Sequence, residues 1–102
     1  MSLDQHFIET SEAILAQLGF KDLKSFVKNQ ALLLMLAKME KYLSEDRLFE
    51  KKYKTSFEEF EQKLKNLKNA EVFEQEDDYL DWRYARENLE RLEKQKQALE
   101  HA

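Results

Sequence analysis

The middle of the chain carries an unbroken apolar run inside an otherwise charged, helical pattern. Residues 31–37 read Ala-Leu-Leu-Leu-Met-Leu-Ala, and apolar residues continue at helical spacing on both sides of this run. A helix that is apolar all round has to be covered on every side. We therefore predict a long central helix over residues 22–54 that a chain of this size covers only with a second copy. The residues expected to self-associate, as a dimer, are Leu32, Leu33, Met35, Leu36 and Met39.

The length of this helix leaves two alternatives. At 1.5 Å per residue it would extend about 50 Å, whereas a compact domain of about 100 residues has a radius of gyration of only about 13 Å. The helix could break near residues 44–46, or it could project from the domain and find a partner. We favour projection.

The same pattern predicts three further helices. Gly19 stands where a left-handed residue ends an N-terminal helix within residues 1–19. Ser56 and Glu59 match the capping box that opens a short helix over residues 56–68. A last helix over residues 77–100 places apolar residues at the spacing of a coiled coil. The predicted fold is therefore an all-α, small helical bundle in one domain, residues 1–102, with a long central helix and a coiled-coil-like C-terminal helix. The C-terminal positions are Trp82, Ala85, Leu89, Leu92, Lys96 and Leu99.

Composition supports this prediction and narrows the setting. The chain has no Pro, one Gly and 37% charged residues, which favours helices. Because it has no Cys, we expect no disulfide and a reducing, cytoplasmic location. Its apolar stretches are shorter than the roughly 18 residues of a membrane span, and no signal peptide is recognisable. The net charge of −4 argues against non-specific nucleic-acid binding.

Residues 71–81 carry six acids, no base and several aromatic residues. They could form a helix N-terminus, where acids are favourable and the aromatic residues pack inward. They could instead form a docking surface, with aromatic anchors ringed by acids that complement a basic partner. Under the second interpretation the residues expected to contact the partner are Phe73, Asp77, Asp78, Tyr79 and Trp82.

One arrangement of carboxylates could support catalysis. Glu58 and Glu61, and further along Glu74 and Asp77, are each three residues apart, so each pair shares a helix face. Two such faces can hold Mg²⁺ against a nucleoside triphosphate, as in the all-helical nucleotide pyrophosphohydrolases, to which this spacing is similar. The chain departs from that family's acidic motif at Gln62. We therefore expect no enzyme activity, no metal and no cofactor, and keep Mg²⁺-dependent hydrolysis as a remote alternative.

Residues 23–99 contain a series of short segments found in the same order in a known group of proteins. In this series the chain resembles small helical bacterial and archaeal antitoxins. The resemblance implies a toxin as partner, encoded next door and held inactive by stoichiometric binding. We therefore expect an antitoxin-like protein-binding module, with a structural coiled-coil oligomer as the alternative. The segments are Phe26-Val27-Lys28-Asn29-Gln30-Ala31, Lys38 with Lys41-Tyr42, Phe49-Glu50-Lys51-Lys52-Tyr53, Ser56-Phe57-Glu58-Glu59-Phe60, Phe73-Glu74, and Glu76-Asp77-Asp78-Tyr79-Leu80-Asp81-Trp82.

Overall fold

The protein is an all-α chain, as predicted. Its structure, a computed structural model, describes residues 4–66 and 73–102, with the side chains of the last helix described from residue 75 onward. The helices are α1 (Gln5–Gln17), α2 (Leu23–Tyr53), α3 (Phe57–Lys65) and α4 (Phe73–Glu100), and the described residues contain no strand.

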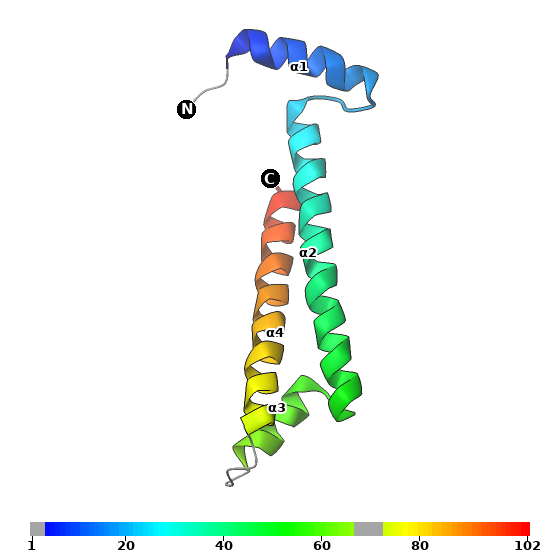
Figure 1. Ribbon diagram of the computed structural model, residues 1–102. Coiled ribbons are helices and arrows are strands. Elements are labelled where there is room, and N and C mark those ends of the chain that lie inside the picture. The colour runs from blue at the N-terminus through cyan, green and yellow to red at the C-terminus, as the bar shows by residue number, and fades with distance from the viewer. Residues whose placement is uncertain (1–3, 67–72) are drawn as a thin grey trace.

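The long helices α2 and α4 lie side by side and antiparallel, and they form the body of the molecule (Figure 1). Helix α3 packs against α4 at one end of this pair, and α1 crosses the beginning of α2 at the other end. The molecule measures 66 × 27 × 21 Å and has a radius of gyration of 20.8 Å, well above the value of about 13 Å for a compact domain of this length. Because α2 is continuous, the alternative of a break near residues 44–46 is wrong.

The helix boundaries follow from the capping residues in the sequence. The carboxylate of Asp4 accepts the backbone N–H of His6 at the start of α1, and Ser56 accepts that of Glu59 at the start of α3. Gly19 has a φ of +94° just after α1, in the region that residues with a side chain rarely adopt. Lys54 ends α2 with a φ of 54°, although it is not a glycine. The second and third helices therefore begin within a residue of their predicted starts, and α1 lies inside the predicted range of residues 1–19.

Helix α4 begins earlier than predicted, at Phe73 instead of residue 77. Residues 73–81 of the acidic stretch are therefore helical, and two of them have partners on the other helices. Asp78 bonds to α2 and Tyr79 bonds to α3, and acids are favourable near a helix N-terminus. Helix α3 ends at Lys65, and the last predicted residues of that helix lie outside the described residues.

The core is a narrow seam between α2 and α4. On α4, the predicted positions Trp82, Ala85 and Leu92 are buried, together with Asn88. Asn88 is held by local bonds, since its amide donates to the carbonyl of Tyr84 and its side-chain oxygen accepts from Arg91. A seam only one helix wide covers one side of α2 and leaves the opposite side to solvent.

Candidate protein-binding surface

A cluster of aromatic rings closes the end of the α2–α4 pair where α3 packs. Trp82 of α4 lies at its centre and is 0% exposed. Its indole stacks at 5.6 Å from the ring of Phe49 and meets the rings of Phe57 and Phe60 at 5.4 Å each. Tyr53 lies 4.3 Å from the Phe60 ring, again between centroids. This aromatic cluster joins α2, α3 and α4.

Trp82 is also fixed by a hydrogen bond to the buried carboxylate of Asp46. The indole Nε1–H donates to Asp46 Oδ1 over 2.7 Å. Arg86, one turn further along α4, lies 3.7 Å from the same oxygen and also pairs with Glu58 of α3 at 2.7 Å. A buried carboxylate is stabilised when it is paired and hydrogen-bonded. The prediction that Trp82 contacts a partner is therefore wrong for this fold, because its ring and its only donor are used inside the chain.

Asp78 is occupied by two side chains of α2. Lys52 Nζ lies 2.6 Å from Asp78 Oδ2, and the hydroxyl of Tyr53 donates to the same oxygen. Burial acts to raise the pKa of Asp78, but these bonds and the charge of Lys52 outweigh it and hold the pKa below its ordinary value. Burial, with the bond to Asp78 and its negative charge, raises the pKa of Tyr53 to about 12.

Tyr79 is engaged in the same way with α3. Its hydroxyl donates to Glu61 over 2.5 Å, and its ring stacks on that of Phe57 at 5.7 Å. The bond to Glu61, with burial and the negative charge of that residue, raises the pKa of Tyr79. Tyr79 and Asp78 thus hold helices together, which agrees with the inward-packing interpretation of the acidic stretch.

Of the five predicted partner-binding residues, only Asp77 is shown to be exposed. The side chain of Phe73 lies outside the described residues. A different exposed surface occurs on the outer side of α4, which we call the α4 stripe: Asp77, Leu80, Asp81 and Tyr84. Its members are three or four residues apart and so share one helix face.

The apolar members of the α4 stripe are the informative ones, since Leu80 and Tyr84 are each 58% exposed. An open groove of about 620 Å³ runs beside the stripe between α4 and α2. Its lining includes Tyr84 and Asp81 of α4 and the exposed Leu48 of α2. The sequence signal for this surface was available, because Leu80 and Tyr84 each lie two residues from Trp82 and so fall off the buried seam. The ring of Tyr84 lies at the edge of the seam, 6.0 Å from that of Tyr42 on α2.

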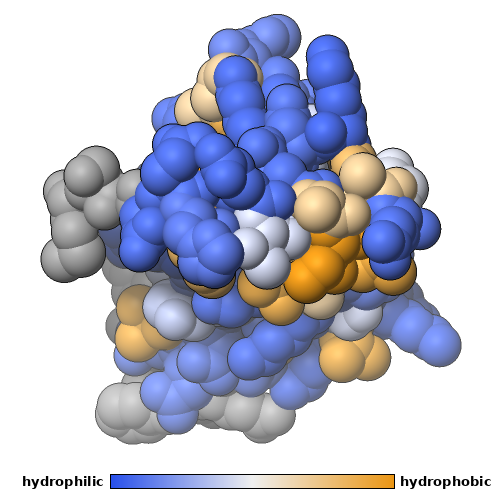
Figure 2. Space-filling model, turned by 90° about the horizontal axis from the view of Figure 1, so that it is seen from above, coloured by the Kyte–Doolittle hydropathy of each residue, from blue (hydrophilic) through white to orange (hydrophobic). Residues whose placement is uncertain are grey.

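The residues predicted to self-associate divide into two groups. Leu32, Met35 and Met39 are half-buried, at the spacing of the face toward α4. Leu33 and Leu36 are exposed, and the neighbouring Leu34 is 70% exposed. Figure 2, which looks down on the α1 end of the molecule, shows apolar side chains open to solvent among polar ones.

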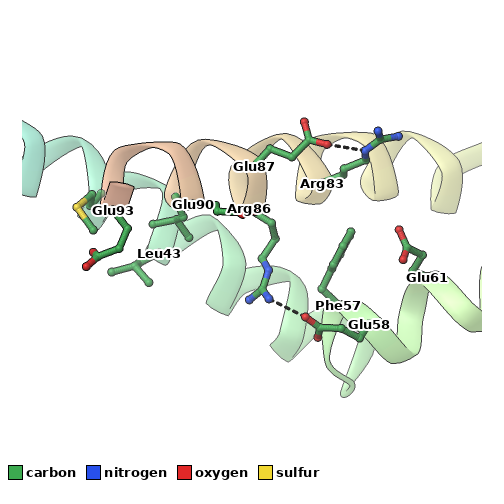
Figure 3. Close-up of a pocket in the computed structure, with 11 residues that line it drawn as sticks. Leu43, Phe57, Glu58, Glu61, Arg83, Arg86, Glu87, Glu90 and Glu93 are labelled. Carbon is green, nitrogen blue, oxygen red and sulfur yellow. Dashed lines mark hydrogen bonds and ion pairs between the residues drawn. The ribbon is translucent and has the colours of Figure 1, made fainter. Parts of the chain in front are cut away.

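Of the four carboxylates of the catalytic alternative, Glu58 and Glu61 are bonded to side chains of α4. Asp77 is exposed, and the side chain of Glu74 lies outside the described residues. Figure 3 shows a groove beside α3 in which Arg86 of α4 bonds to Glu58, while Arg83 bonds to Glu87 along α4. Glu61 accepts the hydroxyl of Tyr79. Within residues 4–66 and 73–102, no group of three or more His, Cys, Asp or Glu side chains is placed to hold a metal ion. This arrangement offers no support for Mg²⁺-dependent hydrolysis.

Comparison of the chain with protein-family models, curated proteins and solved structures finds no match. In the described ranges, no helix is both long and apolar enough to cross a membrane. The geometry of the exposed surfaces is therefore the ground for proposing a function.

Proposed function

We propose that this protein is a non-catalytic, antitoxin-like binding module that docks a basic partner protein on the α4 stripe. The observation that carries the proposal is the exposure of Leu80 and Tyr84 directly beside the carboxylates of Asp77 and Asp81. Apolar and aromatic anchors supply most of the binding energy of an interface. Surrounding charges of one sign select partners of the opposite sign and speed their encounter.

The groove next to the stripe extends the apolar part of this surface. Leu48 of α2, which is exposed, and the ring of Phe49 contribute to it. A partner helix lying along the stripe could bury Leu48, Leu80 and Tyr84 together. The aromatic cluster supports the surface from behind, because it fixes α4 against α2 and α3 through Trp82. A rigid docking surface loses less conformational entropy on binding.

The test uses the protein together with the product of the adjacent reading frame. Light scattering after size exclusion is expected to show a complex with the wild type and none with the variant Asp77→Lys plus Asp81→Lys. Both carboxylates are exposed, so circular dichroism should show unchanged helicity. Asp78 is left intact because it bonds to Lys52 and Tyr53.

A matched control separates the site from total charge. The variant Glu50→Lys plus Glu90→Lys makes the same change in net charge at exposed positions outside the stripe, and it should bind as the wild type does. A second variant, Leu80→Ala plus Tyr84→Ala, should also lose the complex because the anchors are removed. Absence of a complex with the wild type, or equal binding by the lysine variant of the stripe, would contradict the proposal.

A second function, structural self-association, is favoured by a separate observation. Leu33, Leu34 and Leu36 remain exposed in one copy, in the first half of α2. Large contiguous apolar patches on soluble proteins mark interaction sites. The mass in solution of the protein alone tests this function, and a single-chain mass at micromolar concentration would exclude it.

A further inference from the structure

Two exposed apolar stripes lie at the α1 end of the molecule. The α1 stripe consists of Phe7, Ile14 and Leu18, which are four or seven residues apart and share one face of the first helix. The α2 stripe consists of Val27 and Leu34, which are seven residues apart and share one face of α2. Val27 also lines a groove with Leu99 and Ala102 at the end of α4. Both stripes are exposed in a single copy: Leu18 is 67% exposed and Leu34 is 70% exposed.

Helix α1 is tied to the first turn of its own α2 while its stripe stays exposed. Only Leu15 of α1 is buried, and the connection to α2 spans residues 18–22. Glu12 accepts the backbone N–H of Leu23, which ties α1 to the first turn of α2. The rings of Phe20 and Phe26 pack edge to face at 5.2 Å and stiffen the turn between the two helices. These contacts leave the residues of the α1 stripe more than half exposed.

The two helices that carry these stripes have opposite charges in this region. Residues 4–17 contain three acids and no Lys or Arg, so α1 is acidic. Residues 21–41 contain five Lys and two acids, so the first half of α2 is basic. Lys38 and Lys41 continue the line of Leu34 along α2, four and seven residues further on. Opposite charges beside apolar patches favour contact between them.

The spacing along α2 fixes how two copies can satisfy both stripes. An antiparallel register that sets Val27 of one copy opposite Leu34 of the other is symmetric, as a two-fold interface requires. Leu23 lies four residues before Val27, and Lys38 lies four residues after Leu34. In this register the start of one α2, where α1 is attached, therefore lies beside Lys38 of the other copy.

We infer that two copies associate by pairing the α2 stripes antiparallel, with each α1 laid across α2 of the partner copy near Lys38 and Lys41. The apolar residues of α1 then cover the end of the α2 stripe, and Glu9 of α1, which is exposed, meets the two lysines. This inference rests on the self-association proposed above and adds the register and the exchange of α1 contacts.

Disulfide trapping tests the register directly, because the native chain contains no cysteine. Proteins carrying only Val27→Cys or only Leu34→Cys are mixed and oxidised under air. The inferred register predicts that the mixed disulfide dominates over the two symmetric ones. If the disulfide between two Leu34→Cys chains dominates and the protein has the mass of a dimer, the register is wrong but self-association stands. A single-chain mass with no disulfide would overturn both.

Charge reversal tests the role of α1. Glu9→Lys or Lys38→Glu alone should raise the dimer dissociation constant roughly three- to ten-fold at low salt, and the two combined should restore it. Lys65→Glu makes the same change as Lys38→Glu at an exposed position on α3 and should leave dimerisation unchanged. If the combined variant does not recover the wild-type dissociation constant while the mixed disulfide still dominates, the placement of α1 is wrong and the register of α2 stands.

Discussion

The bond between Trp82 and Asp46 gives the sharpest test of what holds the helices together. Replacing Trp82 by Phe keeps an aromatic ring at the centre of the cluster but removes the Nε1–H that donates to Asp46 over 2.7 Å. The carboxylate of Asp46, which is 8% exposed, then keeps only Arg86, at 3.7 Å. The expected result is a protein that folds but is much less stable.

The magnitude follows from two contributions. A hydrogen bond to a charged group contributes about 1.5–3 kcal/mol, and the smaller ring leaves a space that costs roughly 1 kcal/mol more. The expected loss is about 3 kcal/mol of the free energy of unfolding. The whole domain is stabilised by about 5–15 kcal/mol, and 1 kcal/mol shifts the melting temperature of such a domain by about 4–8 °C. Trp82→Phe should therefore lower the melting temperature by roughly 12–24 °C.

The assay is urea unfolding followed by circular dichroism, because Trp82 is the only tryptophan and its fluorescence is lost in the variant. Asp46→Asn is the control, since its amide oxygen still accepts from the indole and the loss should stay near 1 kcal/mol. Combining Trp82→Phe with Asp46→Leu should cost less than the sum of the two single changes. A loss below 0.5 kcal/mol for Trp82→Phe, or strict additivity, would refute this account.

Four further substitutions test the two turns and the bond between Tyr53 and Asp78. Lys54→Gly should raise the free energy of unfolding in urea by about 0.5–1 kcal/mol, because glycine adopts the φ of 54° without strain, whereas Gly19→Ala should lower it by about 1–2 kcal/mol. Asp78→Asn should lower the urea midpoint more at pH 7 than at pH 3. The pKa of Asp78 is depressed below 3.8, so its stabilisation is fully present above 3.8 and is lost as the pH falls through the depressed value. The free energy of unfolding should fall between pH 10 and 12 in the wild type, because the raised pKa of Tyr53 stabilises the fold below pH 10.0 and this contribution is lost as the pH rises to about 12. Tyr53→Phe should make this fall shallower, and an equally steep fall in the variant would contradict the account.

The helices could be predicted from the sequence because each is specified locally. Asp4, Asp22 and Ser56 are capping residues followed by apolar positions at helical spacing, and each caps a helix in the structure. The start of α4 could not be predicted in this way. No capping signal in the sequence marks Phe73, and the first turns of α4 lie beside contacts with α2 and α3, such as those of Asp78 and Tyr79, that join residues distant in the sequence.

The candidate site was only partly predictable for a related reason. The acidic and aromatic composition of residues 71–81 indicated a binding surface, but composition does not tell which aromatic residue faces the core. Trp82 fits the apolar seam of α4 and is buried, whereas Tyr84, two residues on, falls on the outer face. The α2–α4 packing decides between them, and that packing joins residues far apart in the sequence, such as Asp46 and Trp82, which are 36 positions apart.

The antiparallel arrangement of α2 and α4 also orders the steps by which the chain folds. The α2–α4 contacts near α3 join residues that are closer in the sequence: Lys52 and Asp78 are 26 positions apart, and Asp46 and Trp82 are 36 positions apart. At the other end of the pair, Lys28 donates to the backbone carbonyl of Glu100, which is 72 positions away. Closing a short loop costs less entropy, so pairing starts at the aromatic end and advances toward the first half of α2. The side of the apolar run that faces α4 therefore stays uncovered during synthesis until the later part of α4 has been made.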